Sequence, residues 1–209
     1  MIKSRIGKSP DGPIAVLVSG GADSALLLYY LMSQHKDTIH IYTLSPENKG
    51  GKNAKLVPDI IEWCSERTKN TNYTHTTKTV PEQTSPVLFN EVEQWLTSGK
   101  ISGLYGGVTA NPPADVLNGF KTTHNQSENR DPLIHRPEYF NSMYFPFHNI
   151  DKQKIAEQYK EYDLMDLFDL TSSCEWMAPG THRPGIDPEK EHCGHCWWCE
   201  ERIWGFGRL

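Results

Sequence analysis

The clearest hydrophobic pattern lies near the start of the chain, where a short β-branched run, 14–18, is followed by a longer Leu-rich run, 25–32. A short β-branched run is typical of a buried strand. A Leu-rich run that begins after a serine is typical of a helix. The segment from Ser19 to Asp23 is therefore predicted to be a tight turn that leads from a strand into the N-terminus of a helix.

The same alternation of strand and helix patterns continues along the chain. Further strands are predicted at 38–44, 73–79 and 101–108 from their β-rich or alternating composition, and further helices at 54–69, 85–97 and 150–162 from apolar residues that share one face. This order predicts an α/β fold with an open, mostly parallel sheet flanked by helices. Ligands bind such sheets beyond the carboxyl ends of the strands.

Two segments show no periodic pattern. Residues 45–53 contain Pro46, Gly50 and Gly51 and are predicted to be a mobile loop. Residues 111–135 are polar, and a loop of this length in a compact domain is usually functional or disordered, so we interpret it as a substrate lid in preference to a disordered insertion. From residue 171 onward the chain is rich in Cys, Trp, His and Pro, which predicts a main α/β domain over 1–170 and a small subdomain over 171–209.

Composition narrows the class of protein. The chain has 209 residues, a net charge of −5 and a pI of about 6.0, so it lacks the basic character of a general nucleic-acid binder. No apolar run approaches the ~18 residues that a membrane helix needs, and residues 1–13 lack the apolar centre of a signal peptide. We expect a soluble cytoplasmic protein.

The predicted turn has the chemistry of an anion-binding site. Gly20 and Gly21 let a phosphate approach the main chain, and the N–H groups and dipole of the following helix favour an anion. Ser19 and Ser24 add hydroxyl donors. Asp23 would repel a phosphate, but its presence makes sense if it binds a magnesium ion that bridges phosphates. No Lys follows the glycines, so this is not a Walker loop; the plain alternative is a Gly-rich turn of no special function.

The spacing of the cysteines indicates a metal site. Four of the five follow the pattern Cys174-x18-Cys193-x2-Cys196-x2-Cys199. In a reducing compartment such a cluster indicates a metal instead of disulfides, and four thiolates make a closed, structural zinc site. An iron–sulfur cluster and four unligated thiols are the alternatives, and the possible substitute ligands are His182, His192 and His195.

The fifth cysteine, Cys64, falls on the apolar face of a predicted helix. Free Cys is usually a small buried hydrophobe, so this interpretation is preferred to a catalytic one.

The Gly-rich turn and the four-cysteine pattern together resemble the motifs of a known family. The sequence Ser-Gly-Gly-x-Asp-Ser after a strand resembles the pyrophosphatase loop of the adenine-nucleotide α-hydrolase-like enzymes, which have a Rossmann-like fold. Together with the four-cysteine pattern it resembles 7-cyano-7-deazaguanine synthase. Four further segments are similar to that family: Arg136-Pro137-Glu138-Tyr139-Phe140; Pro146-Phe147 with the helix that includes Lys152 to Ala156; Thr171-Ser172-Ser173-Cys174; and Cys199-Glu200-Glu201-Arg202 with Gly205-Phe206.

The resemblance implies an ATP-dependent ligase. Such an enzyme adenylates the carboxylate of 7-carboxy-7-deazaguanine and uses ammonia and a second ATP to form the nitrile, releasing AMP and pyrophosphate. Asp23 and Ser24 would be catalytic, with Mg²⁺ on Asp23, and Arg136 and Glu138 would bind or brace the substrate unless they form only a structural ion pair. The residues implied to bind ATP are Val18, Ser19, Gly20, Gly21, Ala22, Asp23, Ser24 and Ala25; those implied to bind Zn²⁺ are Cys174, Cys193, Cys196 and Cys199.

Departures from the family leave other functions open. After the second strand the family has Tyr-Gly-Gln and a following His, where this chain reads Tyr42-Thr43-Leu44-Ser45-Pro46. The family's Asp-Tyr and Asp-Cys are also missing from the segment before Arg136. A relative that adenylates another carboxylate, or that transfers a deazapurine to a macromolecule, therefore remains an alternative. So do a tRNA or nucleoside thiolation enzyme, for which Cys64 would have to carry sulfur, and a non-catalytic nucleotide-binding zinc module.

The tail is also the source of a prediction about assembly. Four aromatic rings lie close together in a short segment: Trp197, Trp198, Trp204 and Phe206. A small zinc subdomain cannot bury all four, and aromatic residues are enriched in the cores of interfaces. With the family resemblance this predicts a homodimer; the alternative is that the rings pack on the parent sheet.

Overall fold

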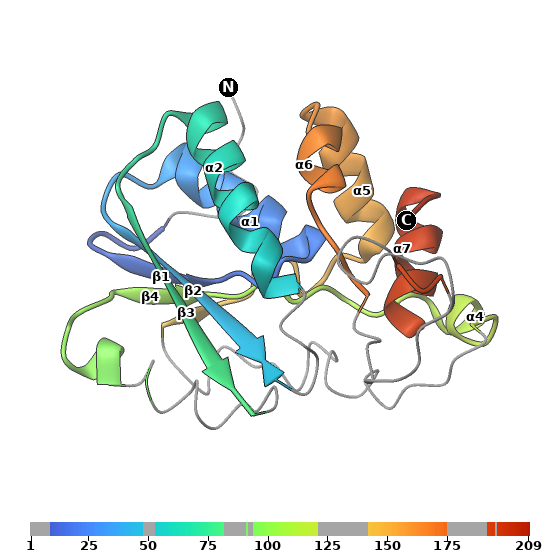
Figure 1. Cartoon of the computed structure of the whole chain (residues 1–209), viewed down its shortest axis with the longest axis horizontal. Helices are drawn as coiled ribbons and strands as arrows, with labels where there is room; N and C mark the ends of the chain where they lie inside the picture. Colours follow the sequence, from blue (N-terminus) through green and yellow to red (C-terminus); the bar gives the residue numbers. More distant parts are fainter. Residues whose placement is uncertain are drawn as a thin grey trace.

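A computed structural model describes residues 9–47, 53–81, 91, 94–120, 142–174, 192–194 and 196–209. Its centre is a five-stranded sheet with the strand order β3-β2-β1-β4-β5, in which every pairing is parallel. The strands are β1 (Ile14–Leu17), β2 (Ile39–Pro46), β3 (Tyr73–Val80), β4 (Gly103–Tyr105) and β5 (Met143–Tyr144) (Figure 1). The predicted α/β class with a parallel sheet and flanking helices is confirmed.

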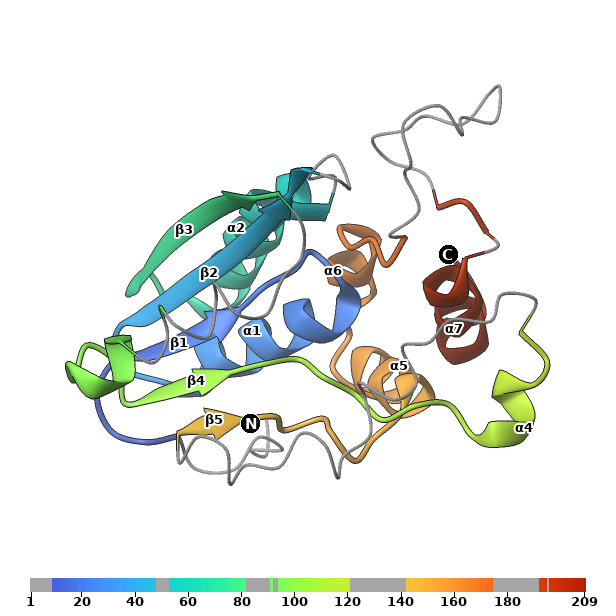
Figure 2. The same ribbon diagram turned by 90° about the horizontal axis from the view of Figure 1, so that it is seen from below.

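Helices connect and cover these strands. They are α1 (Ala22–Gln34), the 3₁₀ turn η2 (Asn53–Leu56), α2 (Val57–Thr68), α4 (Ala114–Leu117), α5 (Lys152–Glu161), α6 (Met165–Asp169) and α7 (Trp197–Phe206). In Figures 1 and 2, α1 and α2 lie against the β1–β2–β3 part of the sheet, while α5, α6 and α7 form a group beside the N-terminal end of α1.

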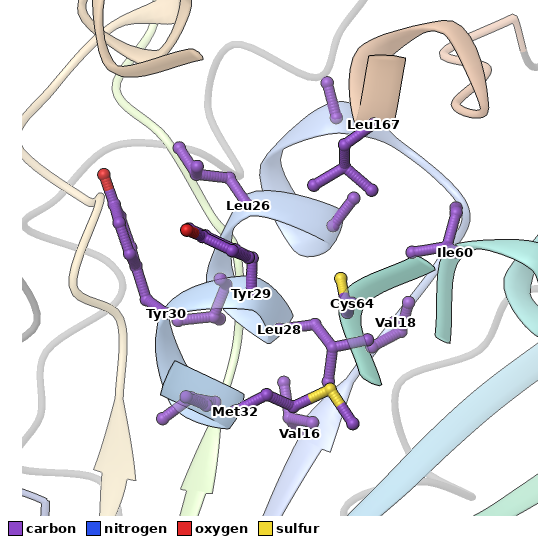
Figure 3. Close-up of a cluster of buried hydrophobic side chains, with 14 of the residues drawn as sticks. Val16, Val18, Leu26, Leu28, Tyr29, Tyr30, Met32, Ile60, Cys64 and Leu167 are labelled. Carbon is purple, nitrogen blue, oxygen red and sulfur yellow. The ribbon is translucent and has the colours of Figure 1, made fainter. Parts of the chain in front are cut away.

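The alternation of side chains along β1 divides the core into two layers. Ile14 and Val16 point into the larger cluster with α1, α2, α5 and α6, part of which is drawn in Figure 3. Ala15 and Leu17 point to the opposite face, where Trp95 and Leu96 of the helical segment 94–97 cover the sheet. Because both faces of β1 are covered, this strand is a continuous hydrophobic run, as the sequence indicated, whereas β3, at the end of the strand order, is mostly polar and partly exposed.

Three predicted boundaries were wrong. Residues 45 and 46 belong to β2, not to a loop, because Ser45 and Pro46 continue the parallel pairing opposite Thr79 and Val80. The strand predicted over 101–108 is only Gly103–Tyr105, since the glycines that follow pack closely on other segments. Helix α1 begins at Ala22, so Ala22 and Asp23 form its first turn and are not part of the preceding turn.

Several predictions fall partly or wholly outside the described residues. Arg136 and Glu138 do so, as does most of the segment 111–135, of which only 111–120, including α4, is described. Of the helix predicted over 85–97, residues 91 and 94–97 are described and are helical. Elements β5, α4, α6 and α7 were not predicted. Within the described part of the chain, no helix has the length and apolar character needed to cross a bilayer.

Candidate functional site

The predicted phosphate-binding turn lies at the point where the sheet reverses its strand order. The chain proceeds outward from β1 to β2 and β3 and then returns to place β4 on the other side of β1. The turn that includes Ser19, Gly20 and Gly21 leaves the carboxyl end of β1 at this position. In open α/β sheets, ligands bind in the crevice at such a reversal.

The turn is closed by its own serines. The hydroxyls of Ser19 and Ser24 are 3.3 Å apart, and the backbone N–H of Ser19 donates to Ser24 Oγ at 3.2 Å. The Ser24 hydroxyl donates to the Gly21 carbonyl at 3.0 Å. Gly20 has a φ of +87°, and a Cβ there would lie 2.8 Å from the carbonyl carbon of Asn53 and closer still to its oxygen. Glycine is therefore required at this position both by backbone conformation and by space.

The N-terminus of α1 faces the same site. Its N-cap residue is Gly21, which has no side chain to cap the next N–H groups, while the N–H of Gly21 itself donates to the Ser19 hydroxyl at 3.4 Å. The segment after β4 passes close beneath it, since a Cβ on Gly107 would lie 2.9 Å from the backbone nitrogen of Ser24. A helix N-terminus with uncapped N–H groups, next to a Gly-rich turn, is suited to an anion such as a phosphate.

Two long-range hydrogen bonds fix the turn to the rest of the protein. The Tyr159 hydroxyl of α5 donates to the Ala22 carbonyl at 2.7 Å, and the Ser172 N–H donates to the Gly20 carbonyl at 3.0 Å. Burial raises the pKa of Tyr159 well above its usual value, so this phenol stays protonated as a donor. The turn is thus held at both ends by residues far away in the sequence.

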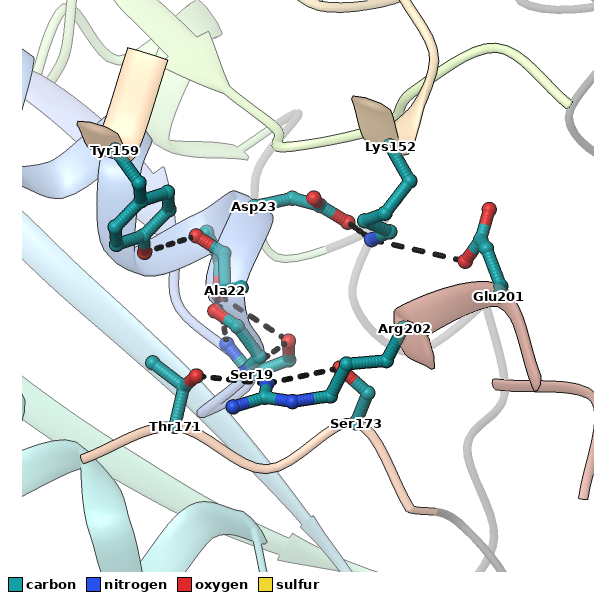
Figure 4. Close-up of polar contacts among 11 residues, drawn as sticks. Ser19, Ala22, Asp23, Lys152, Tyr159, Thr171, Ser173, Glu201 and Arg202 are labelled. Atoms are coloured by element: carbon teal, nitrogen blue, oxygen red, sulfur yellow. Dashed lines mark hydrogen bonds and ion pairs between the residues drawn. The ribbon is translucent and has the colours of Figure 1, made fainter. Parts of the chain in front are cut away.

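Asp23 is part of a buried group of charges (Figure 4). Lys152, the first residue of α5, pairs with Asp23 Oδ2 and lies 3.6 Å from Glu201 Oε2 of α7. An ammonium at a helix N-terminus opposes the helix dipole, and these two carboxylates offset that cost.

The other carboxylate oxygen, Asp23 Oδ1, is buried and makes no hydrogen bond with the described residues. An unpartnered buried carboxylate oxygen is costly unless a ligand or ion completes its environment. Oxygen ligands of this kind suit Mg²⁺, which usually binds one or two carboxylates together with substrate phosphates. The residues present therefore fit a magnesium ion, with Asp23 as its protein ligand.

Arg202 connects α7 to residues 171–173, the segment that is hydrogen-bonded to the turn. Its guanidinium donates to Thr171 Oγ1 at 2.9 Å and to the Phe168 carbonyl at 3.1 Å, and it lies 3.6 Å from the centre of the Phe168 ring. Burial lowers the pKa of Arg202 to about 10, so the group remains charged at neutral pH. Because the Ser172 N–H donates to the Gly20 carbonyl, Arg202 supports the predicted phosphate-binding turn through residues 171–173.

The four predicted metal ligands lie together. The sulfur atoms of Cys174, Cys193, Cys196 and Cys199 are all within 4.8 Å of one another. Tetrahedral zinc with Zn–S bonds of about 2.3 Å requires sulfur pairs about 3.8 Å apart, and the Cys193–Cys199 pair is separated by 3.8 Å. Backbone N–H groups of Cys196 and Cys193 donate to the sulfurs of Cys193 and Cys174 at 3.2 and 3.4 Å. This cluster could hold a metal ion such as zinc.

The close approach of the sulfur atoms changes the pKa of two of these thiols. Hydrogen bonding with Cys174 raises the pKa of Cys196 to about 12 and also raises that of Cys199. Cys196 and Cys199 therefore favour the protonated form unless a cation balances the thiolates, so metal binding there would release protons.

Cys64 does not lie in either site. It is fully buried in the core between α1 and α2, and burial raises the pKa of its thiol. A buried, protonated thiol is a poor nucleophile. The interpretation as a core residue fits this environment, and a sulfur-carrying role for Cys64 does not.

The aromatic residues of the tail divide into two groups. Trp197 is buried and contacts Phe120 and Trp198, while Phe206 stacks on Phe168 with ring centroids 4.1 Å apart. Trp198 and Trp204 are partly exposed. Two of the four rings are therefore buried within the chain, Trp198 packs partly against Trp197 and the cysteine cluster, and the homodimer remains a prediction.

Sequence reasoning missed the residues that support the turn. Lys152, Glu201 and Arg202 fall in segments noted for their resemblance to a family, but they were assigned no role. One signal was available for Lys152, because a lysine directly after the N-cap residue of a helix opposes the dipole, and a nearby carboxylate would offset that cost. Nothing in the sequence could identify that partner as Asp23.

Comparison with known proteins adds no assignment: no protein-family model and no curated protein matches this chain.

Proposed function

We propose that this chain is an ATP-dependent enzyme that cleaves ATP between its α- and β-phosphates and transfers the adenylate to a carboxylate. The single observation that supports this most is the pairing of an uncapped helix N-terminus with the buried, unpartnered Asp23 Oδ1 at the edge of the sheet. This arrangement offers N–H donors to phosphates and a carboxylate to Mg²⁺, and its sequence lacks the Walker lysine.

The chemistry follows from the electronic character of a carboxylate. A carboxylate is a poor electrophile until one oxygen becomes a phosphate ester, and adenylation by ATP supplies that ester with pyrophosphate as the leaving group. The turn would bind the phosphates through backbone N–H groups and the Ser19 and Ser24 hydroxyls. Bound Mg²⁺ would neutralise the phosphate charge that develops.

The proposed acid is 7-carboxy-7-deazaguanine. Ammonia would displace AMP from the acyl adenylate to give the amide. A second ATP would then adenylate the amide oxygen, and loss of this AMP would give the nitrile, 7-cyano-7-deazaguanine. This part of the proposal rests on the resemblance of the turn, the cysteine pattern and the C-terminal segments to 7-cyano-7-deazaguanine synthase. The same resemblance leads us to propose that the chain has the Rossmann-like fold of the adenine-nucleotide α-hydrolase-like enzymes. The differences after β2 keep another carboxylate, or transfer of a deazapurine to a macromolecule, as the alternative.

The test is to incubate the purified chain with ATP, Mg²⁺, an ammonium salt and 7-carboxy-7-deazaguanine, and to quantify the nucleotide and phosphate products. We expect AMP and pyrophosphate that depend on the acid. The appearance of ADP and inorganic phosphate would contradict the proposal. The same assay with other carboxylates tests the identity of the acid separately from the type of reaction. AMP and pyrophosphate that depend on a different acid would change the proposed substrate and keep the proposed reaction.

The corresponding variant is Asp23→Ala, which should abolish pyrophosphate release and leave the fold intact, since Lys152 retains Glu201 as a partner. Asp59→Ala is the matched control, because Asp59 also lies in the first turn of a helix but is exposed. Equal activity of the two variants would remove Asp23 from the site.

A further inference from the structure

A buried lysine lies between two carboxylates beside the phosphate-binding turn. The side chains of Lys152 and Glu201 are 4% and 2% exposed, whereas that of Asp23 is 19% exposed. Asp23 is therefore the more exposed and Glu201 the more buried of the two carboxylates, and Lys152 lies between them (Figure 4). The Lys152 ammonium is already within ion-pair distance of both.

The carbon chain of Lys152 is fixed, while its end can reach either partner. A Cβ on Gly205 of α7 would lie 2.9 Å from Lys152 Cβ and closer still to Cγ, so α7 packs directly on the first part of this side chain. The Glu201 carboxylate is 3.6 Å from Nζ, so a small rotation about the outer bonds of the lysine would shorten this contact and open the one to Asp23.

Charge decides when that rotation would occur. One ammonium between two carboxylates leaves a net negative charge, and Asp23 Oδ1 has no hydrogen-bond partner among the described residues. A divalent cation that approaches Asp23 would be repelled by an ammonium on the same carboxylate. Among the described residues, Glu201 is the second carboxylate within ion-pair distance of Lys152. It can therefore hold the ammonium away from the cation.

We propose that Lys152 is an internal cation that occupies Asp23 in the absence of ligand, and that Glu201 receives its ammonium when magnesium and nucleotide bind. Glu201 is thus a positioning residue, which acts on the ligand only through Lys152 and Asp23. The proposal rests on the proposed function in one respect, since it takes Mg²⁺ and ATP as the ligands of the turn.

The experiment measures binding of α,β-methylene-ATP, which cannot be cleaved at the α–β bond, by titration calorimetry with Mg²⁺ and in buffer free of divalent metal. In Glu201→Gln the ammonium has lost its second carboxylate, so we expect binding with Mg²⁺ to weaken about tenfold, the size of one hydrogen bond between charged groups. Binding without Mg²⁺ should not weaken. Glu200→Gln removes the same charge from the adjacent residue and should leave both values unchanged.

Two results would overturn the proposal: equal binding of the magnesium complex by Glu201→Gln and wild type, or equal weakening with and without Mg²⁺. If Glu201→Gln does not fold, Lys152→Gln decides through Mn²⁺ binding to the ligand-free chain, measured by electron paramagnetic resonance. Removal of the competing ammonium should tighten Mn²⁺ binding, and unchanged binding would reject the idea. A wild type that binds Mn²⁺ but no nucleotide analogue would contradict the proposed function alone.

Discussion

At Gly20 the chain needs both a positive φ angle and the absence of a Cβ, and these two demands have different energetic consequences. A positive φ disfavours any L-residue by itself. The contact with the Asn53 carbonyl adds a steric cost, because neither backbone segment can move without disturbing the turn or η2. Gly99 also has a positive φ, of +71°, but a Cβ there would meet nothing within 4 Å.

This difference gives a matched pair of substitutions. Gly20→Ala should lower the free energy of unfolding by about 2–5 kcal/mol, since strain and overlap both apply. Gly99→Ala should lower it by only about 1–2 kcal/mol. Denaturant unfolding of both variants measures the two values, and equal losses would show that Asn53 does not crowd Gly20.

His35 provides a second prediction at the scale of a residue. This histidine follows α1, is buried, and bonds the Gly12 carbonyl through Nε2 at 3.1 Å; burial lowers its pKa below the usual 6.5. Between the lowered pKa and 6.5 the unfolded chain binds more protons than the folded chain, so the folded state loses stability as the pH falls through this window. In His35→Gln the loss of stability between pH 7 and pH 5 should be smaller than in wild type. A parallel pair of stability–pH curves would contradict this assignment.

At the same scale, sequence reasoning found the residues whose chemistry is local and missed those whose partners are distant. The glycines and serines of the turn were predicted because their pattern, strand context and helix context are contiguous. Lys152 and Asp23 are separated by 129 positions. Such a pair is set by the packing of α5 on the end of α1, which no local pattern specifies.

At the scale of elements, the long periodic segments were predicted and the short ones were not. Helices α1 and α2 have an apolar run or face that is long enough to identify, whereas β5 has two residues and α4 has four. Helix α7 was missed for another reason. Two of the cysteines with metal-ligand spacing lie at its start, Cys196 as the N-cap residue and Cys199 in the first turn. Sequence analysis interpreted both only as metal ligands and did not consider a helix there.

The packing of α7 on α5 can be tested at Gly205. Helix propensity alone would make Gly205→Ala more stable by about 1 kcal/mol. Because the new methyl group would overlap the Lys152 side chain, we expect instead a loss of about 1–3 kcal/mol. Thermal unfolding gives the sign directly. A double-mutant cycle with Lys152→Ala should recover part of the loss, and additive effects would indicate that the strain lies elsewhere.

At the scale of the whole molecule, the cysteine cluster and the phosphate-binding turn are connected through one helix. The candidate metal ligands Cys196 and Cys199 lie at the N-terminal end of α7, and Glu201 and Arg202 follow closely. Phe206, near the other end, belongs to the main hydrophobic core with Tyr159 and Phe168. The cluster therefore fixes one end of α7, and the core fixes the other.

This connection predicts the effect of removing the metal. Structural zinc contributes on the order of 10 kcal/mol to the folding of small zinc peptides, so Cys196→Ser should be poorly soluble or melt at a much lower temperature. Elemental analysis of the wild type should give one zinc per chain. Iron in that analysis would favour the cluster alternative, and soluble protein without metal would contradict the prediction. As a control, Cys64→Ser should retain its metal even though it destabilises the core.

The support of the phosphate-binding turn by α7 also has a consequence for synthesis on the ribosome. The strands β1 to β3 and helices α1 and α2 are made first and can associate as soon as they emerge, since their contacts are close in sequence. The turn itself is translated among the first 25 residues, yet its contacts with Lys152, Tyr159 and Ser172 cannot form until those residues have left the exit tunnel. The further support from Glu201 and Arg202 of α7 comes later still. A nascent chain would therefore acquire most of its sheet early and the full support of the proposed nucleotide site last, when the four clustered cysteines have also emerged.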